Sequence, residues 1–124
     1  MRRVKFIAAP FLLLSACVSP GYEGQVGSVV SGDQIIAQRE ANRSIAVFAT
    51  EPAGYQGMGE ISVRRCHRSA VEEPPSIAVL TDDLQIAAYG QGADAISDIR
   101  TEKLNGLAAN CWYVVEATAL MLRR

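Results

Sequence analysis

The order of strand-like and helix-like segments in this sequence predicts an α+β fold: a small, mainly antiparallel four-stranded sheet (β-β-α-β-β) with one helix packed on one face. Two segments with strand patterns precede a single amphipathic segment and two more follow it. Prolines and glycines punctuate the connections between them. A chain of 124 residues has room for one modest hydrophobic core. The strands and the helix are therefore expected to share that core.

The first two strands are expected at residues 44–50 and 56–66. The first segment, SIAVFAT, is compact, apolar and partly β-branched, which is typical of a strand. In the second, Ile61 and Val63 alternate with polar neighbours, which is the pattern of a half-buried strand. Two glycines near its start predict a bend or a bulge there. The next segment, HRSAVEEPP, is expected to be a loop, because consecutive prolines fit neither a helix interior nor a central strand.

A helix is expected to start after Ser76, whose side chain can cap its first turn. Apolar residues recur at three- and four-residue steps from Ile77 to Leu84 and are expected to share one buried face. Asp83 and Gln85 are expected to point away from that face. The glycines of AAYGQG are expected to end the helix, because its closing residue often has a left-handed backbone.

The last two strands are expected at residues 93–104 and 111–122. The segment between them, NGLAAN, begins with Asn-Gly, a dipeptide that favours hairpin turns. The final segment, CWYVVEATALML, is the most apolar of the predicted strands. A sheet covered by one helix leaves its edges and one face open, and these are natural places for a partner to bind.

The amino-terminal residues 1–16 are expected to be a secretory signal peptide. A short basic head, MRRVK, precedes an apolar run that is too short to span a bilayer, which takes about 20 residues. The run ends in LSAC, which resembles the lipobox of bacterial lipoprotein precursors. The resemblance implies that the thiol of Cys17 carries a diacylglycerol and that the chain is cut just before it. The alternative is an ordinary signal peptide with a cysteine there by chance.

Acylated Cys17 would hold the protein to a membrane, because two or three acyl chains anchor a protein far more firmly than one chain does. Lipoproteins that are retained at the inner membrane typically have an aspartate directly after the acylated cysteine. This chain resembles the others, because it has Val18 in that place. We therefore expect the outer membrane as the address. The first partner of the protein is then outer-membrane lipid, and its domain faces the periplasm.

Residues 17–43 are expected to be a lipidated flexible tether. They are rich in Gly, Ser and Gln and hold few large apolar side chains, so ordering them would gain little burial. Residues 33–42 are expected to form a turn or two of helix, with Ile35 and Ile36 touching the folded domain. That domain is expected to span residues 44–124.

Charge and motif content exclude several classes of function. All thirteen acidic residues follow Cys17, whereas three of the twelve basic residues precede it, so the mature chain is net acidic. Nucleic-acid binding needs a basic surface and is not expected. The acidic pairs Glu72-Glu73 and Asp82-Asp83 are neighbours in sequence rather than a convergent pair. No nucleophile elbow and no phosphate-binding glycine loop occur. We therefore expect no enzyme and no cofactor.

Cys66 and Cys111 are the cysteines that remain after lipidation. In an oxidising compartment such a pair is expected to form a disulfide, which contributes roughly 4 kcal/mol in the chain-entropy model. The competing interpretation makes both cysteines metal ligands together with His67, the sole histidine. Neighbouring residues on a strand point to opposite faces, which disfavours a shared ion for Cys66 and His67. We therefore expect a disulfide and no metal, with His67 exposed in a loop.

Arg64, Arg65 and Arg68 form a basic cluster in sequence at the end of the second predicted strand. Guanidinium groups bind phosphates and carboxylates well, so the cluster is a candidate site for lipopolysaccharide phosphates or an acidic partner protein. The alternative is a solvated strand end that Glu72 and Glu73 balance.

Several motifs together resemble the periplasmic domain of RcsF-type outer-membrane lipoproteins, which sense envelope stress. These motifs are GEIS followed by a cysteine, PPSI, ADAI, and a second cysteine that opens a final strand containing ALML. The similarity covers about residues 44–122, and it implies a disulfide between Cys66 and Cys111. The second disulfide of that family has no counterpart, since Thr101 and Ala117 occupy its positions.

A more distant resemblance links GADA, at residues 92–95, to YbjQ-type small domains. RcsF-type tethers are longer and richer in proline, so threading of a β-barrel is not expected here. The sequence thus predicts a lipid-anchored periplasmic module that binds or senses another envelope protein, with a role in envelope stress signalling as the finer expectation. The alternative is a YbjQ-like domain that binds a metal or a small ligand.

Overall fold

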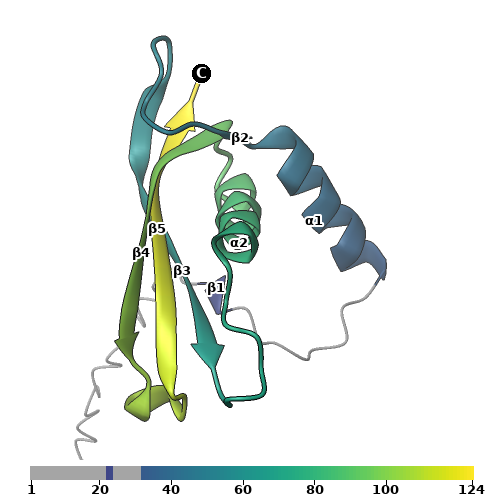
Figure 1. The fold of residues 1–124 in the computed structure, drawn as a ribbon. Coiled ribbons are helices and arrows are strands. Elements are labelled where there is room, and N and C mark those ends of the chain that lie inside the picture. The colour runs from purple at the N-terminus through teal and green to yellow at the C-terminus, as the bar shows by residue number, and fades with distance from the viewer. Residues whose placement is uncertain (1–21, 24–31) are drawn as a thin grey trace, which may run out of the picture.

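The computed structural model of the chain describes residues 22–23 and 32–124, so the predicted signal peptide and Cys17 lie outside the described residues. The described residues form two helices and a five-stranded sheet (Figure 1). The helices are α1 (Gly32–Ser44) and α2 (Ile77–Gly90), the strands are β1 (Tyr22–Glu23), β2 (Ala46–Val47), β3 (Gln56–His67), β4 (Ala95–Asn105) and β5 (Tyr113–Arg123), and the 3-10 turn η1 spans Leu107–Ala109.

The sheet has the strand order β1-β3-β5-β4-β2. The three long strands are antiparallel, and the two short strands pair in parallel with β3 and β4. Helix α2 packs on one face of the long strands (Figure 1), so the predicted α+β class is confirmed. The sheet has five strands instead of the predicted four, because Tyr22–Glu23, within the predicted tether, pairs with β3 as β1. The first predicted strand is shorter than expected. Phe48 still donates its backbone N–H to the carbonyl of Ile96, and the chain then leaves β4 and turns at Gly54, whose φ is 85°.

The hydrophobic core lies between α2 and the sheet. As predicted, Ser76 caps α2, and its Oγ accepts the backbone N–H of Val79 at 3.3 Å. Leu80 and Leu84 are buried as expected, whereas Ile77, in the first turn, is exposed. The buried members of the core are Ile45, Ile61, Val63, Leu80, Leu84, Ala88, Ala93, Ile96, Ala117, Ala119 and Met121.

Asp83 and Gln85 of α2 are buried, in contrast to the solvated positions expected from the helical pattern. Asp83 accepts hydrogen bonds from Arg65 of β3. The Nε2 of Gln85 donates to the carbonyl oxygens of Asn42, at 3.3 Å, and Ile45, at 2.7 Å. Buried polar groups need such partners. The partners come from other elements, which the periodicity of one helix does not reveal.

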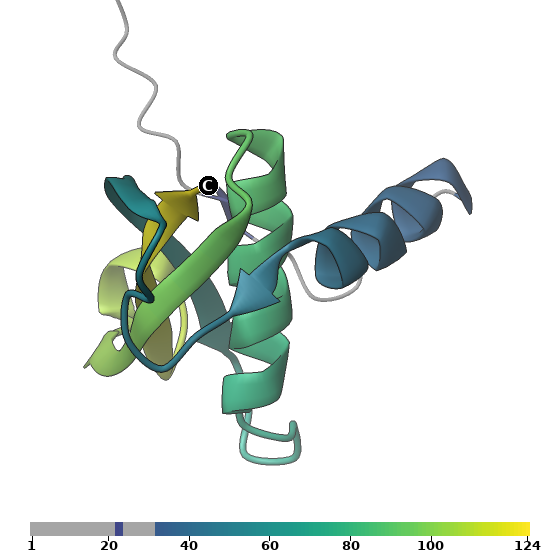
Figure 2. The same cartoon turned by 90° about the horizontal axis from the view of Figure 1, so that it is seen from above.

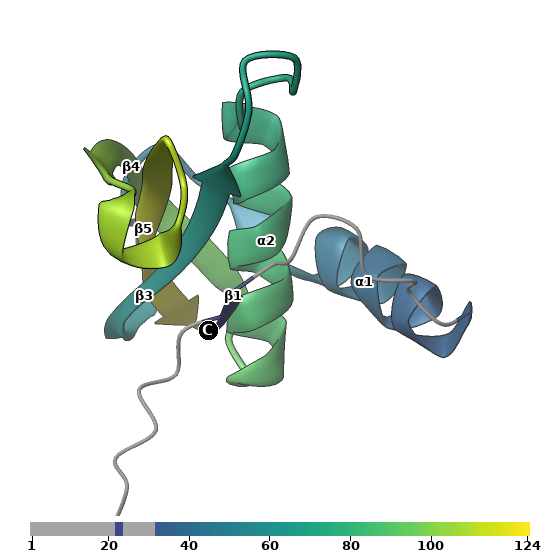
Figure 3. The ribbon, with the colours of Figure 1, turned by 90° about the horizontal axis from the view of Figure 1, so that it is seen from below.

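Helix α1 lies largely within the segment that was expected to be a tether, so the described fold includes residues that precede position 44. Its carboxy-terminal end is fastened by the buried side chain of Ala41 and by the bond from Gln85 to Asn42. The helix projects from the body of the domain (Figures 2 and 3). Ile35 and Ile36 are exposed, so they do not anchor the segment as expected.

Two irregularities interrupt the long strands. The bulge expected near the start of β3 is confirmed between Gly57 and Gly59, and Gly59 has a φ of 115°. A second bulge, which was not predicted, lies in β4 between Ser97 and Arg100. Within it, Asp98 has a φ of 54°, a value that non-glycine residues rarely adopt.

The turn between β4 and β5 is longer than a two-residue hairpin, because it contains η1. Gly106 has an ordinary φ of −95°, and it is needed here for space. A Cβ at this position would lie 2.4 Å from the carbonyl oxygen of Cys111.

Among the described helices, none combines the length and the apolar character that a membrane crossing requires.

Candidate partner-binding site at the disulfide end of the sheet

A disulfide joins Cys66, near the end of β3, to Cys111, which lies between η1 and β5. The predicted bridge is therefore confirmed. A backbone hydrogen bond of 2.9 Å from the N–H of Trp112 to the carbonyl of His67 links the same two segments. We call this end of the sheet, residues 66–68 and 105–113, the closed end.

His67 is buried, with 5% of its surface exposed, so the prediction of an exposed loop residue is wrong. β3 continues through this residue, and alternation along the strand turns the imidazole toward the face that α2 covers. The ring stacks on Tyr113, which lies directly opposite in β5, with 4.7 Å between centroids. Trp112 approaches edge-on, at 6.2 Å. The Nδ1 atom of His67 is buried without a hydrogen-bond partner among the described residues.

The described fold does not arrange Cys66, His67 and Cys111, the alternative set of metal ligands, around one common site. Both sulfur atoms belong to the disulfide. Strand alternation places the side chains of Cys66 and His67 on opposite faces of the sheet. In residues 22–23 and 32–124, no three His, Cys, Asp or Glu side chains come together as possible metal ligands.

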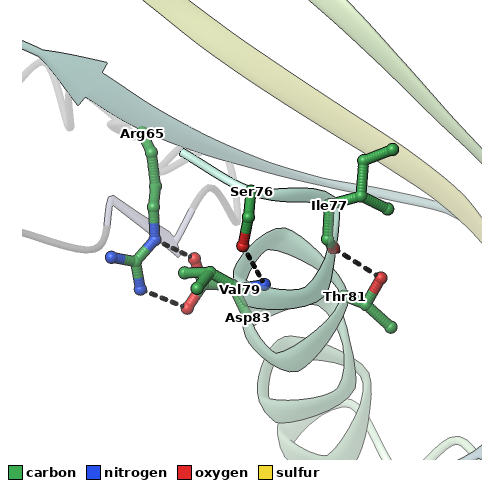
Figure 4. Close-up of polar contacts among 6 residues, drawn as sticks. All are labelled: Arg65, Ser76, Ile77, Val79, Thr81 and Asp83. Carbon is green, nitrogen blue, oxygen red and sulfur yellow. Dashed lines mark hydrogen bonds and ion pairs between the residues drawn. The ribbon is translucent and has the colours of Figure 1, made fainter. Parts of the chain in front are cut away.

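The fold separates two arginines of the predicted basic cluster. Arg64 and Arg65 are neighbours on β3, so their side chains point to opposite faces. Away from α2, the Nε of Arg64 donates to Oε1 of Glu116 at 2.9 Å. On the α2 face, Nε and Nη2 of Arg65 donate to the two carboxylate oxygens of Asp83, at 2.5 and 2.8 Å (Figure 4). Such a two-point ion pair is directional, so it holds α2 on β3 in one orientation.

Arg68 lies just beyond β3, and its side chain is exposed. Its backbone N–H donates to Oε2 of Glu72 at 3.1 Å, so the loop after β3 folds back on this residue. The three arginines therefore do not converge on one anion. Arg65 serves the packing of α2, whereas Arg68 lies where a partner at the closed end would meet it.

Large apolar side chains are exposed at the closed end. Trp112, the only tryptophan of the chain, is 63% exposed, and Leu107 in η1 is 83% exposed. Val71, in the loop that leaves β3, is also exposed. An exposed tryptophan offers a large contact area with little conformational freedom to lose, which is why tryptophan is enriched at binding hot spots.

Sequence reasoning missed this apolar surface because it placed Trp112 within one apolar strand over residues 111–122. β5 begins at Tyr113, so Trp112 precedes the strand and is turned outward beside the disulfide. The available signal was a lone tryptophan directly after a cysteine that was expected to be bridged.

No model of a known protein family matches the chain, and no curated protein sequence matches it. The resemblance to RcsF-type and YbjQ-type proteins therefore stays a prediction that rests on motifs.

Proposed function

We propose that this protein is an outer-membrane lipoprotein, anchored through acylated Cys17, whose domain faces the periplasm and binds another protein of the envelope. The observation that carries the proposal is the disulfide between Cys66 and Cys111. Disulfides persist in oxidising compartments and are rare in the reducing cytosol. The lipobox-like LSAC motif supports the same address from an independent part of the chain.

The closed end supports a binding role. Trp112 and Leu107 are exposed on the segment between β4 and β5, which the disulfide and a backbone hydrogen bond fasten to the end of β3. A rigid surface loses little entropy when a partner docks on it. Arg68, beside this surface, favours a partner with an acidic rim. A role in envelope stress signalling is the finer proposal, and it rests on the RcsF-type resemblance alone.

The anchor is tested with the full chain expressed in a Gram-negative bacterium that is fed labelled palmitate. We expect label in the wild-type chain and its recovery with outer membranes, whereas Cys17→Ser carries no label and leaves that fraction. A Cys111→Ser variant is the matched control, because it should keep the label. A wild-type chain without label, or one that salt alone removes from membranes, contradicts the proposed anchor.

The binding surface is tested by placing a photo-crosslinking amino acid at Leu107 of the full chain in intact cells. We expect a defined adduct with an envelope protein that disappears when Trp112→Ala is added. Ala53 is the matched control position, because it is exposed in the loop before β3, at the other end of that strand. The same adduct from both positions, or an adduct that survives Trp112→Ala, contradicts binding through the closed end.

A further inference from the structure

Half of β4 is an open sheet edge among the described residues. β2 pairs only with Ala95 and Ile96, at the start of β4. Residues 100–105 pair with β5 on one side and have no described strand on the other (Figure 1). The first four residues of this edge, Arg100 to Lys103, are all exposed. A strand edge of this kind presents backbone N–H and carbonyl groups to an incoming strand.

A row of charges crosses the sheet on the face away from α2 and stops at this edge. Arg64 of β3 lies directly opposite Glu116 of β5, and Glu116 lies directly opposite Glu102 of β4. Arg64 forms its ion pair with Glu116. Glu102 makes no ion pair with any described residue, and like charges directly opposite each other destabilise a sheet. The row therefore lacks a cation on the open side of Glu102.

The neighbouring row of residues across the sheet lacks an anion instead of a cation. Ser62 of β3 lies opposite Thr118 of β5, and Thr118 lies opposite Arg100 of β4. Arg100 is exposed and has no ion-pair partner in the described part of the chain. An incoming strand would thus complete both rows if it carried a cation opposite Glu102 and an anion opposite Arg100.

β4 itself carries these two charges at the required spacing. When two β4 strands run antiparallel with Thr101 facing Thr101 of a second copy, each Arg100 lies opposite the other copy's Glu102. The twofold axis is perpendicular to the sheet, so it keeps both charge pairs on the face away from α2. We propose that the protein pairs with a second copy of itself through the β4 edge in this register.

The bulge in β4 limits the length of this contact. The strand is irregular between Ser97 and Arg100, so regular pairing spans little more than residues 100–102 on each copy. Such a contact buries a small area, which is typical of weak and reversible association. The self-pairing does not depend on the membrane address or on the closed end, because none of its residues belongs to either.

The register is tested with two differently tagged full-length copies that are expressed together and treated with formaldehyde in intact cells, so that a weak and reversible contact survives purification. Their co-purification is the readout. We expect wild-type copies to co-purify. Arg100→Glu in both copies, or Glu102→Arg in both copies, should lower recovery about tenfold, because each reversal replaces two attractive pairs by two repulsive ones. One copy with Arg100→Glu and one with Glu102→Arg should recover co-purification, since this mixture restores opposite charges at both positions.

A crosslink between two copies tests the proposed strand register independently of the charge reversals. Thr101→Cys should form a covalent dimer with a mild oxidant or a short bismaleimide, because facing residues of paired strands lie about 5 Å apart. Thr118→Cys is the matched control. It lies on the same sheet, and it would be separated from its own copy by three strand spacings, about 14 Å. The unsubstituted chain is a second control, because any covalent dimer that it forms must come from its native cysteines.

Three results would overturn the self-pairing. They are wild-type copies that do not co-purify, single charge reversals without effect, and a mixed pair that fails to recover. Capture of a different protein by Thr101→Cys, without the dimer of the chain, would assign the edge to another partner. These outcomes leave the proposed anchor and the closed end untouched, so failure of one proposal is distinguishable from failure of the other.

Discussion

The imidazole of His67 lies buried at the end of β3, where Tyr113 stacks on it and Trp112 meets it edge-on. Its ring contributes packing, whereas its Nδ1 atom is buried without a hydrogen-bond partner among the described residues. A buried polar atom that makes no hydrogen bond costs roughly 1–3 kcal/mol. The aromatic shape of this side chain therefore stabilises the closed end, and its polarity opposes that effect.

We expect His67→Phe to raise the free energy of unfolding by about 1 kcal/mol, because the substitution keeps an aromatic ring against Tyr113 and removes the unsatisfied nitrogen. Urea denaturation of the purified protein measures the change. His67→Ala is the control, and it should destabilise because the stacked ring is lost. A His67→Phe variant that is less stable than wild type would show that Nδ1 has a bonded role in the folded protein.

At the scale of elements, α2 is held on the sheet by apolar burial and by the two-point ion pair between Arg65 and Asp83. The Asp83 side chain is 5% exposed, whereas the pair of Arg64 and Glu116 lies on the open face of the sheet. Removing one partner of a buried pair leaves a charge without compensation, which costs far more than losing an exposed pair. Two neighbouring arginines of β3 are therefore expected to differ strongly in their effect on stability.

We expect Arg65→Met to lower the free energy of unfolding by about 3 kcal/mol, because it leaves the buried carboxylate of Asp83 without its guanidinium. Arg64→Met is the matched control and should cost less than about 1 kcal/mol. Adding Asp83→Leu to Arg65→Met should recover most of the loss, since the buried charge is then removed. Equal effects of the two arginine substitutions in urea denaturation would contradict this assignment.

At the scale of the whole molecule, the disulfide closes a loop whose ends are 45 residues apart and which contains α2 and β4. In the chain-entropy model a bridge of this span contributes about 4 kcal/mol, mainly by restricting the unfolded chain. Small domains have only about 5–15 kcal/mol of net stability. The bridge is therefore expected to be a major support of the fold.

We expect Cys66→Ala combined with Cys111→Ala to lower the free energy of unfolding by about 4 kcal/mol, and a reductant to lower that of the wild-type protein by a similar amount. Adding reductant to the double variant should change nothing further, which controls for other effects of the reagent. Urea denaturation curves with and without reductant give all four values. An unchanged wild-type curve in reductant would contradict a structural role for the bridge.

Local patterns in the sequence determined the long strands, the capped helix α2 and the bulge at Gly57 and Gly59, because alternation, capping and glycine placement act over a few residues. The sequence also predicted the pairing of Cys66 with Cys111, because the proposed acylation of Cys17 leaves two cysteines for one bridge. Tertiary structure alone decided the burial of His67 and the separation of Arg64 from Arg65. It also decided the anchoring of α1 through Gln85 and the charge row that ends at Glu102. These features depend on which residues of distant segments lie opposite one another, and strand register and helix docking set that relation across the whole core.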